Sequence, residues 1–143
     1  MRLWRVSNYA DLSGVGGTLV AGRWHSRGRP VLYAAEHPAG AILELLAHME
    51  RGEIPATYRL LGIDAPDAAA TETPPLPEDW RARPAATRAV GDAWLAEGAS
   101  LLLRIPSALA PHSSNYLINP RHADAAVLRL ALVEPLDLDQ RLA

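Results

Sequence analysis

The chain has 143 residues, of which 49% are hydrophobic, and this is typical of one globular domain with a buried core. The formal net charge of −2 disfavours bulk binding to nucleic acid, which requires a basic surface. All 14 basic residues are arginines and cysteine is absent, which excludes a lysine nucleophile, a disulfide and a cysteine metal site. We therefore expect a single domain spanning residues 1–143.

The sequence carries no segment typical of secretion or of membrane insertion. Residues 1–14 lack the apolar core of a signal peptide. No run approaches the roughly 18 apolar residues that a membrane span requires. The absence of cysteine is compatible with a reducing compartment. We therefore expect a cytoplasmic protein that does not contact the membrane.

The first half of the chain predicts short extended segments followed by a helix. Residues 1–6 predict a strand, 7–18 a polar, glycine-rich loop, 19–21 a second extended segment and 31–33 a short strand. After Pro38, a core face of helical spacing is formed by Ile42, Leu43, Leu45, Leu46 and Met49. Gly52 is the expected end of this helix. A strand that runs into a helix start predicts an anion site, because the first helical amides lack partners.

The second half predicts further strands around one helix. We expect a strand at 57–63, a surface loop at 64–79 and a buried strand at 100–105. Pro84 and Gly98 bracket a predicted helix at 84–97, whose apolar side consists of Ala89, Val90, Ala93, Trp94 and Leu95. Residues 106–122 predict a polar loop, 123–129 a helical turn and 127–133 a last strand.

Three kinds of hydrolytic site are weakly supported or disfavoured. The histidines (His25, His37, His48, His112 and His122) form no HExxH motif and no pair three or four residues apart, so we expect no metal site. Glu36 and Glu44 would lie roughly 12 Å apart along one helix, which exceeds the roughly 5–9.5 Å of a glycosidase pair. A serine triad stays open among Ser107, Ser113, Ser114, His112 and Asp124, although the G-x-S-x-G elbow is missing.

Arg23, Tyr33 and Glu44 form the remaining candidate set, spread over a turn, a strand and a helix. A guanidinium forks onto phosphate, a phenol offers a flat face to a heteroaromatic ring, and a carboxylate stabilises positive charge at a sugar C1. These are the requirements for breaking a nicotinamide–ribose bond. Residue types alone support this weakly, because a surface arginine, a core tyrosine and a solvated glutamate are common.

Several segments in order resemble the RES domain family, the toxins of RES–Xre toxin–antitoxin pairs. They are WRV with Arg5, then GRWHSRGRPVLYAAEHPAGAILELL with Arg23, Tyr33 and Glu44, then VGDAWL at 90–95 and IPSALAPHSSNYLINPRH at 105–122. The resemblance covers nearly the whole chain. It implies a single compact α/β (α+β) domain similar to the ADP-ribosyltransferases of the diphtheria-toxin type. It also implies NAD+ as the substrate, which would be hydrolysed, phosphorolysed or used to ADP-ribosylate a protein. No further cofactor is implied.

The resemblance also implies a role for each matching residue. Arg23 would bind the NAD+ phosphates with help from Arg5, and Tyr33 would pack on the nicotinamide or ribose beside Trp24. Glu44 would serve the oxocarbenium-like transition state. The family serine falls on Ser107 in preference to Ser114, and Asn115 would order the loop. His25 departs from the pattern, which has asparagine in GRWN, so its role stays open.

The same resemblance implies an Xre-like helix-turn-helix antitoxin as a partner, one that blocks the NAD+ site. A homodimer or a larger toxin–antitoxin assembly is also compatible with it. Two alternatives stay open at this point. One is a module that binds a nucleotide or a partner without turnover, and the other is a toxin directed at nucleic acid, which the negative net charge disfavours.

Overall fold

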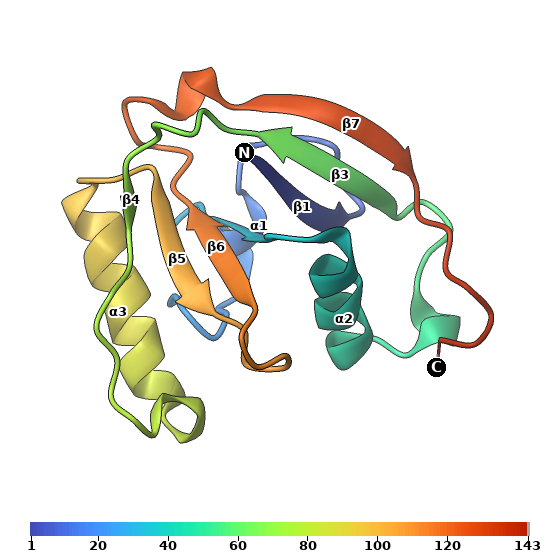
Figure 1. The fold of residues 1–143 in the computed structure, drawn as a ribbon, viewed down its shortest axis with the longest axis horizontal. Coiled ribbons are helices and arrows are strands. Elements are labelled where there is room, and N and C mark those ends of the chain that lie inside the picture. The colour runs from blue at the N-terminus through green and yellow to red at the C-terminus, as the bar shows by residue number, and fades with distance from the viewer. Residues whose placement is uncertain (143) are drawn as a thin grey trace.

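The protein, described by a computed structural model over residues 1–142, is built on a seven-stranded sheet of order β4-β5-β6-β2-β1-β3-β7 (Figure 1). Only the β4–β5 pair is parallel, and the other neighbours are antiparallel. The strands are β1 (Arg2–Ser7), β2 (Leu32–Ala35), β3 (Arg59–Asp64), β4 (Thr71–Glu72), β5 (Leu102–Pro106), β6 (Ser114–Ile118) and β7 (Arg129–Pro135).

Two longer helices pack against different parts of this sheet. The helix α2 (Pro38–His48) lies against β1 and β2, whereas α3 (Pro84–Glu97) lies beside β5 at the other end (Figure 1). A short helix α1 (Gly16–Leu19) precedes β2, and single 3₁₀ turns are formed by η1 (Arg51–Glu53), η2 (Trp80–Ala82) and η3 (Ala125–Val127). No helix within residues 1–142 is long and apolar enough to cross a membrane.

The core consists of two clusters, one on each face of the sheet. Successive side chains along β5 and β6 point alternately into one cluster and the other. Leu102 and Ile118 belong to one cluster, and Leu103 and Leu117 belong to the other. This follows from strand geometry, because successive side chains point to opposite faces of a sheet. The second cluster also contains Trp94 of α3, so this helix covers one face of the sheet.

Strands β1 and β2 separate almost as soon as they meet. They pair at one position, Trp4 with Ala35, whereas β1 pairs with β3 along its whole length. The chain leaves β2 at Ala35 and enters α2 at Pro38, so the helix begins beside the point of separation. This divergence leaves side chains of both strands facing a shared space, in which the candidate site lies.

The expected strands and the helix at 84–97 are present, but several segments differ from expectation. The predicted loop at 106–122 contains β6, a central strand with three buried residues, and the predicted loop at 64–79 contains β4. The glycine-rich stretch forms α1, which takes in Leu19 from the expected extended segment at 19–21. Helix α2 ends at His48 rather than near Gly52, because Met49 takes an extended backbone and Gly52 lies in η1.

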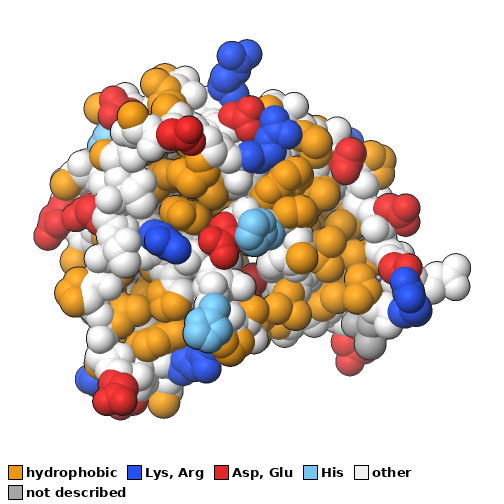
Figure 2. Space-filling view, in the orientation of Figure 1, with side chains coloured by type: hydrophobic (Ala, Val, Ile, Leu, Met, Phe, Trp, Pro, Cys, Tyr) orange, Lys and Arg blue, Asp and Glu red, His pale blue; other side chains and the backbone are white. Residues whose placement is uncertain are grey.

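The apolar faces of both helices also differ from the predicted ones. In α2 the buried residue is Ala41, while Leu43 is 40% exposed and Ile42, Leu45, Leu46 and Met49 are half-buried. Hydrophobic side chains accordingly gather over α2 on the surface shown in Figure 2. In α3 the predicted Trp94 and Leu95 are buried, but Ala89 and Ala93 are exposed, and Thr87 and Gly91 are buried in their place. Close packing against residues 22–26 explains the burial of these two small residues.

Candidate active site

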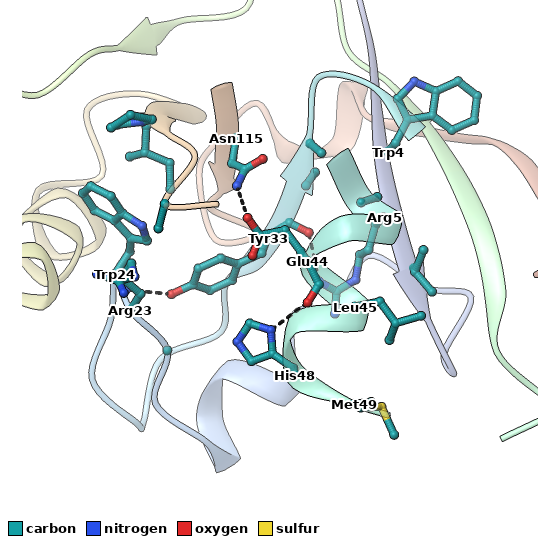
Figure 3. Close-up of a pocket in the computed structure, with 18 of the residues that line it drawn as sticks. Trp4, Arg5, Arg23, Trp24, Tyr33, Glu44, Leu45, His48, Met49 and Asn115 are labelled. Atoms are coloured by element: carbon teal, nitrogen blue, oxygen red, sulfur yellow. Dashed lines mark hydrogen bonds between the residues drawn. The ribbon is translucent and has the colours of Figure 1, made fainter. Parts of the chain in front are cut away.

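A cavity of about 410 Å³ opens where β1, β2 and α2 diverge. This volume falls within the roughly 300–1,000 Å³ of small-molecule sites. The walls combine residues of four strands (β1, β2, β5 and β6), the turn at 22–24 and α2. The predicted site residues among them are Arg5, Arg23, Trp24, Tyr33, Glu44 and Asn115 (Figure 3). Six side chains predicted from separate segments therefore share one cavity.

The Glu44 carboxylate is held in place by two partners on the opposite strand and loop. The Asn115 side-chain amide donates to Glu44 Oε1 at 2.9 Å, as Figure 3 shows, and the Ser107 hydroxyl lies 3.5 Å from the same oxygen. Glu44 is half-buried, on the side of α2 that faces β6. The hydrogen bond from the Asn115 side-chain amide fixes which way the Glu44 carboxylate faces. A fixed orientation is required of a group that acts on a bound substrate.

Ser107 is buried and lies behind the cavity wall, whose lining includes its neighbours Pro106 and Ala108. Its hydroxyl oxygen accepts hydrogen bonds from the main-chain amides of Leu109 and Ala110, at 3.2 and 3.1 Å. Ser107 therefore closes the turn after β5 and reaches the cavity only through Glu44. Ser114, the other candidate serine, accepts a hydrogen bond from Arg104 on the exposed side of the hairpin.

The turn that carries Arg23 is clamped by one face of α3. The Thr87 hydroxyl donates to the Arg23 carbonyl at 2.6 Å, and Arg88 donates to the Gly22 carbonyl at 2.9 Å. One turn further along, Asp92 accepts from the amide and hydroxyl of Ser26. Gly91 lies so close that a Cβ there would meet the Trp24 carbonyl oxygen at 1.6 Å. The helix therefore fixes the backbone that presents Arg23 to the cavity.

Arg23 is half-buried, and within residues 1–142 its guanidinium makes one hydrogen bond, to the Arg81 carbonyl at 3.1 Å. A guanidinium has five N–H donors, so most of this group is free to bind an anion. Trp24, in contrast, is only 3% exposed and packs against Trp80 with ring centroids 5.8 Å apart. Trp24 therefore forms part of the core and contributes an edge of the cavity wall.

Tyr33 projects from β2 between Arg23 and Glu44 (Figure 3). Its hydroxyl lies 2.7 Å from Nδ1 of His25 and accepts the Trp24 main-chain amide at 3.1 Å. Burial raises the pKa of Tyr33 to about 12, so the phenol is neutral at physiological pH. The ring thus offers an uncharged, fixed surface within the cavity.

Arg5 enters the cavity from β1, on the side opposite Arg23. One guanidinium nitrogen donates to the Tyr33 carbonyl at 3.0 Å. Burial lowers the pKa of Arg5 below its ordinary value. Within residues 1–142 no carboxylate lies at salt-bridge distance from this guanidinium. The cavity thus holds a positive charge without a paired anion of its own.

The sequence predicted an anion site at the start of α2. In the first turn of α2, Ala41 lines the cavity, and the amides of Gly40 and Ala41 both donate to the His37 carbonyl, so these two amides are already paired. Sequence reasoning missed His48 and Tyr58 as lining residues and missed the clamp formed by α3. The only signal for that clamp was the pair of small residues Thr87 and Gly91, four apart on one helix face.

Among residues 1–142, no three His, Asp or Glu side chains are placed to hold a metal ion.

Comparison with known proteins shows the family to which this chain belongs. A family model described as RES domain matches residues 2–139. The chain belongs to the RES domain family. A RES relative from Pseudomonas putida named Toxin Res is 48% identical and aligns over 99% of both chains. Another from Sphingobium sp., named Prs ADP-ribosylating toxin, is 35% identical over 97% of this chain and 94% of its own.

A solved structure shares the fold of this RES domain. A chain of the M. tuberculosis MbcT–MbcA toxin–antitoxin complex superposes with a TM-score of 0.74, covering 94% of this chain and 83% of its own. Its sequence is 20% identical, so the likeness concerns the fold alone. This likeness and the single mixed sheet confirm the α/β fold class that the sequence predicted.

Proposed function

We propose that this RES domain is the toxin of a toxin–antitoxin pair and that it consumes NAD+ by breaking the bond between nicotinamide and ribose. The observation that carries the proposal is the meeting of Arg23, Tyr33 and Glu44 in one cavity. The names of the two relatives, Toxin Res and Prs ADP-ribosylating toxin, support a toxin that uses ADP-ribose chemistry.

The two arginines supply the binding part of the proposal. Arg23 offers a largely free guanidinium fork, and Arg5 places a second positive charge on the other side of the cavity. A pyrophosphate carries two negative charges and accepts bidentate hydrogen bonds from such groups. Anchoring the pyrophosphate would hold the attached ribose in place, so that the reacting bond is presented in a fixed orientation.

Glu44 supplies the chemical part. When the nicotinamide–ribose bond breaks, its electron pair goes to the pyridinium nitrogen, nicotinamide leaves neutral, and positive charge develops on the ribose C1 and ring oxygen. A carboxylate already oriented by Asn115 would stabilise this charge without reorganising. The neutral Tyr33 ring would pack on the nicotinamide or ribose.

The acceptor that captures the ADP-ribosyl cation is water, phosphate or a protein side chain. Water or a protonated side-chain nucleophile loses one proton as the new bond to C1 forms, whereas an anionic phosphate oxygen forms this bond without losing a proton. NAD+ is the substrate in this proposal, and no further cofactor is needed. An Xre-like helix-turn-helix antitoxin that covers the cavity is the proposed partner. The solved MbcT–MbcA toxin–antitoxin complex supports an antitoxin partner.

Incubation of the purified protein with NAD+, followed by chromatography for free nicotinamide, tests the proposal. We expect wild-type protein to release nicotinamide and Glu44→Gln to release almost none while keeping its melting temperature. Glu50→Gln is the matched control, because Glu50 is exposed just after α2 and lies outside the cavity. Full activity of Glu44→Gln would reject the mechanism. Binding of NAD+ without any release of nicotinamide would favour a non-catalytic binding module.

Adding phosphate, or a cell extract as a source of protein acceptors, to the same reaction identifies the acceptor. Free ADP-ribose indicates hydrolysis, ADP-ribose 1″-phosphate indicates phosphorolysis, and protein that carries label from the adenine of NAD+ indicates transfer. Degradation of nucleic acid in place of NAD+ would overturn the proposal altogether.

A further inference from the structure

His25 is one of the most deeply buried polar side chains in the protein, and the proposed chemistry does not use it. It is 2% exposed and lies in the turn that carries Arg23 and Trp24. Both of its ring nitrogens have partners: Nε2 lies 3.1 Å from the Gly17 carbonyl oxygen, and Nδ1 lies 2.7 Å from the Tyr33 hydroxyl. The imidazole therefore bridges the segment around α1 to a side chain of the cavity wall.

These partners determine where the protons lie. A carbonyl oxygen can only accept, so Nε2 of the neutral ring carries the hydrogen and donates to Gly17. Nδ1 is then an acceptor, and the Tyr33 hydroxyl donates to it. The same hydroxyl oxygen accepts a hydrogen bond from the Trp24 main-chain amide. The O–H hydrogen of Tyr33 and one lone pair of its oxygen are therefore both in hydrogen bonds. The phenol is thus fixed at its far end by groups on one turn.

Gly22 shows how closely that turn surrounds the hydroxyl. A Cβ at position 22 would lie 2.5 Å from Tyr33 Oη and 3.2 Å from His25 Nδ1. No side chain therefore fits between the turn and the phenol, and the hydroxyl is enclosed by Gly22, Trp24 and His25. The opposite end of Tyr33 is fixed by β2, which pairs with β6 at this residue.

We propose that His25 is a positioning residue for Tyr33: its ring carries a hydrogen-bond chain from the Gly17 carbonyl to the phenol and holds the aromatic face against the cavity. The consequence for turnover rests on the proposed function, in which Tyr33 packs on the reacting end of NAD+. Histidine suits the task because its two nitrogens place an acceptor and a donor on different sides of one rigid ring.

Two amide replacements separate this role from a merely structural one. The Oδ1 atom of asparagine can take the place of Nδ1, so His25→Asn keeps an acceptor for Tyr33 and loses the reach to Gly17. The side-chain amide of glutamine reaches the place of Nε2, so His25→Gln keeps the bond to Gly17 and loses the acceptor for Tyr33. We expect kcat/KM of His25→Asn to stay close to wild type and that of His25→Gln to fall roughly tenfold to a hundredfold, the scale of a misplaced reacting group.

The double variants with Tyr33→Phe test whether the effect travels through the hydroxyl. In the Tyr33→Phe background, His25→Asn and His25→Gln should have equal kcat/KM, because the acceptor no longer has a donor to bind. Equal losses in the two single variants, or a difference that persists without the hydroxyl, would overturn the proposal. His112→Asn serves as the control, because His112 is exposed and its φ of 67° is one that asparagine adopts readily.

A spectroscopic measurement keeps the test independent of turnover. The ¹⁵N spectrum of labelled histidine reports which ring nitrogen is protonated, and we expect His25 to be the Nε2–H tautomer near neutral pH. Loss of the Tyr33 hydroxyl should shift the Nδ1 resonance of His25 in Tyr33→Phe. A protonated Nδ1 in the neutral ring would overturn the positioning role, even if the protein cleaves NAD+. If wild-type protein leaves NAD+ intact, the proposed function fails, and this spectrum still decides the hydrogen-bond chain.

Discussion

The guanidinium of Arg5 donates to the main-chain carbonyl of Tyr33 at 3.0 Å, across the gap where β1 and β2 have stopped pairing. A carbonyl at a broken strand edge needs a donor, and the arginine side chain supplies one from the neighbouring strand. The same contact holds a half-buried positive charge at the cavity wall. Within residues 1–142 no carboxylate lies at salt-bridge distance from this guanidinium. Because a partly buried cation without a paired anion is costly, this wall is suited to an anionic ligand such as the proposed pyrophosphate.

Arg23→Ala should weaken substrate binding more than turnover. The substitution removes charge-assisted hydrogen bonds to the substrate, each of which contributes about 1.5–3 kcal/mol, and this corresponds to a KM increase of roughly tenfold to a hundredfold. Steady-state kinetics of nicotinamide release measures the effect. Arg27→Ala is the control, because Arg27 is exposed in the same loop and does not line the cavity. An unchanged KM for Arg23→Ala would remove Arg23 from the binding site.

Asn115→Ala should lower kcat and leave KM nearly unchanged. Without the 2.9 Å hydrogen bond from the Asn115 amide, Glu44 Oε1 keeps only the 3.5 Å contact with the Ser107 hydroxyl. The carboxylate then loses its fixed orientation. The loss of one hydrogen bond to a charged group is worth about 1.5–3 kcal/mol, so we expect kcat to fall at least tenfold. The exposed Asn8 offers a control in Asn8→Ala. A normal kcat in Asn115→Ala would show that this bond does not prepare Glu44.

Gly91→Ala should destabilise the protein although alanine favours helix. In an exposed helix the change would gain about 1 kcal/mol. Here the new Cβ would meet the Trp24 carbonyl oxygen at 1.6 Å, so α3 must move away from the turn that carries Arg23. Overpacking of this kind costs about 1–3 kcal/mol, which chemical denaturation can measure. Gly16→Ala is the control, since a Cβ at position 16 has no heavy atom within 4 Å.

The stability of the protein should depend on Tyr33 at high pH. Its pKa is raised to about 12 in the folded state, against an ordinary value near 10, so the folded protein keeps a proton that the unfolded chain releases. The contribution of the protonated Tyr33 to the free energy of unfolding is therefore fully present below about pH 10 and is lost as pH rises toward 12. Urea denaturation from pH 8 to 11 should show the stability gap between wild type and Tyr33→Phe narrowing above about pH 10. A constant gap over this range would contradict the raised pKa.

The sequence by itself determined the local elements with clear periodic or terminal signals. Pro84 and Gly98 bracket α3 as expected, and Gly98 takes the left-handed backbone that a glycine after a helix allows. The order of Arg23, Tyr33 and Glu44 within recognisable segments was enough to indicate the family, which the RES domain match confirms. These properties are local, so a single segment contains the information needed to read them.

Tertiary structure alone decided which side chains are buried and which groups they contact. The strand β6 has a short apolar run between polar residues, so only its place between β5 and β2 makes it a core strand. The burial of Thr87 and Gly91 depends on the turn at 22–26, which is more than 60 residues away in the chain. The unpaired charge of Arg5 and the two-sided bridge of His25 likewise arise from partners on other elements. Hydrogen bonding and burial depend on neighbours in space, and a linear pattern does not contain them.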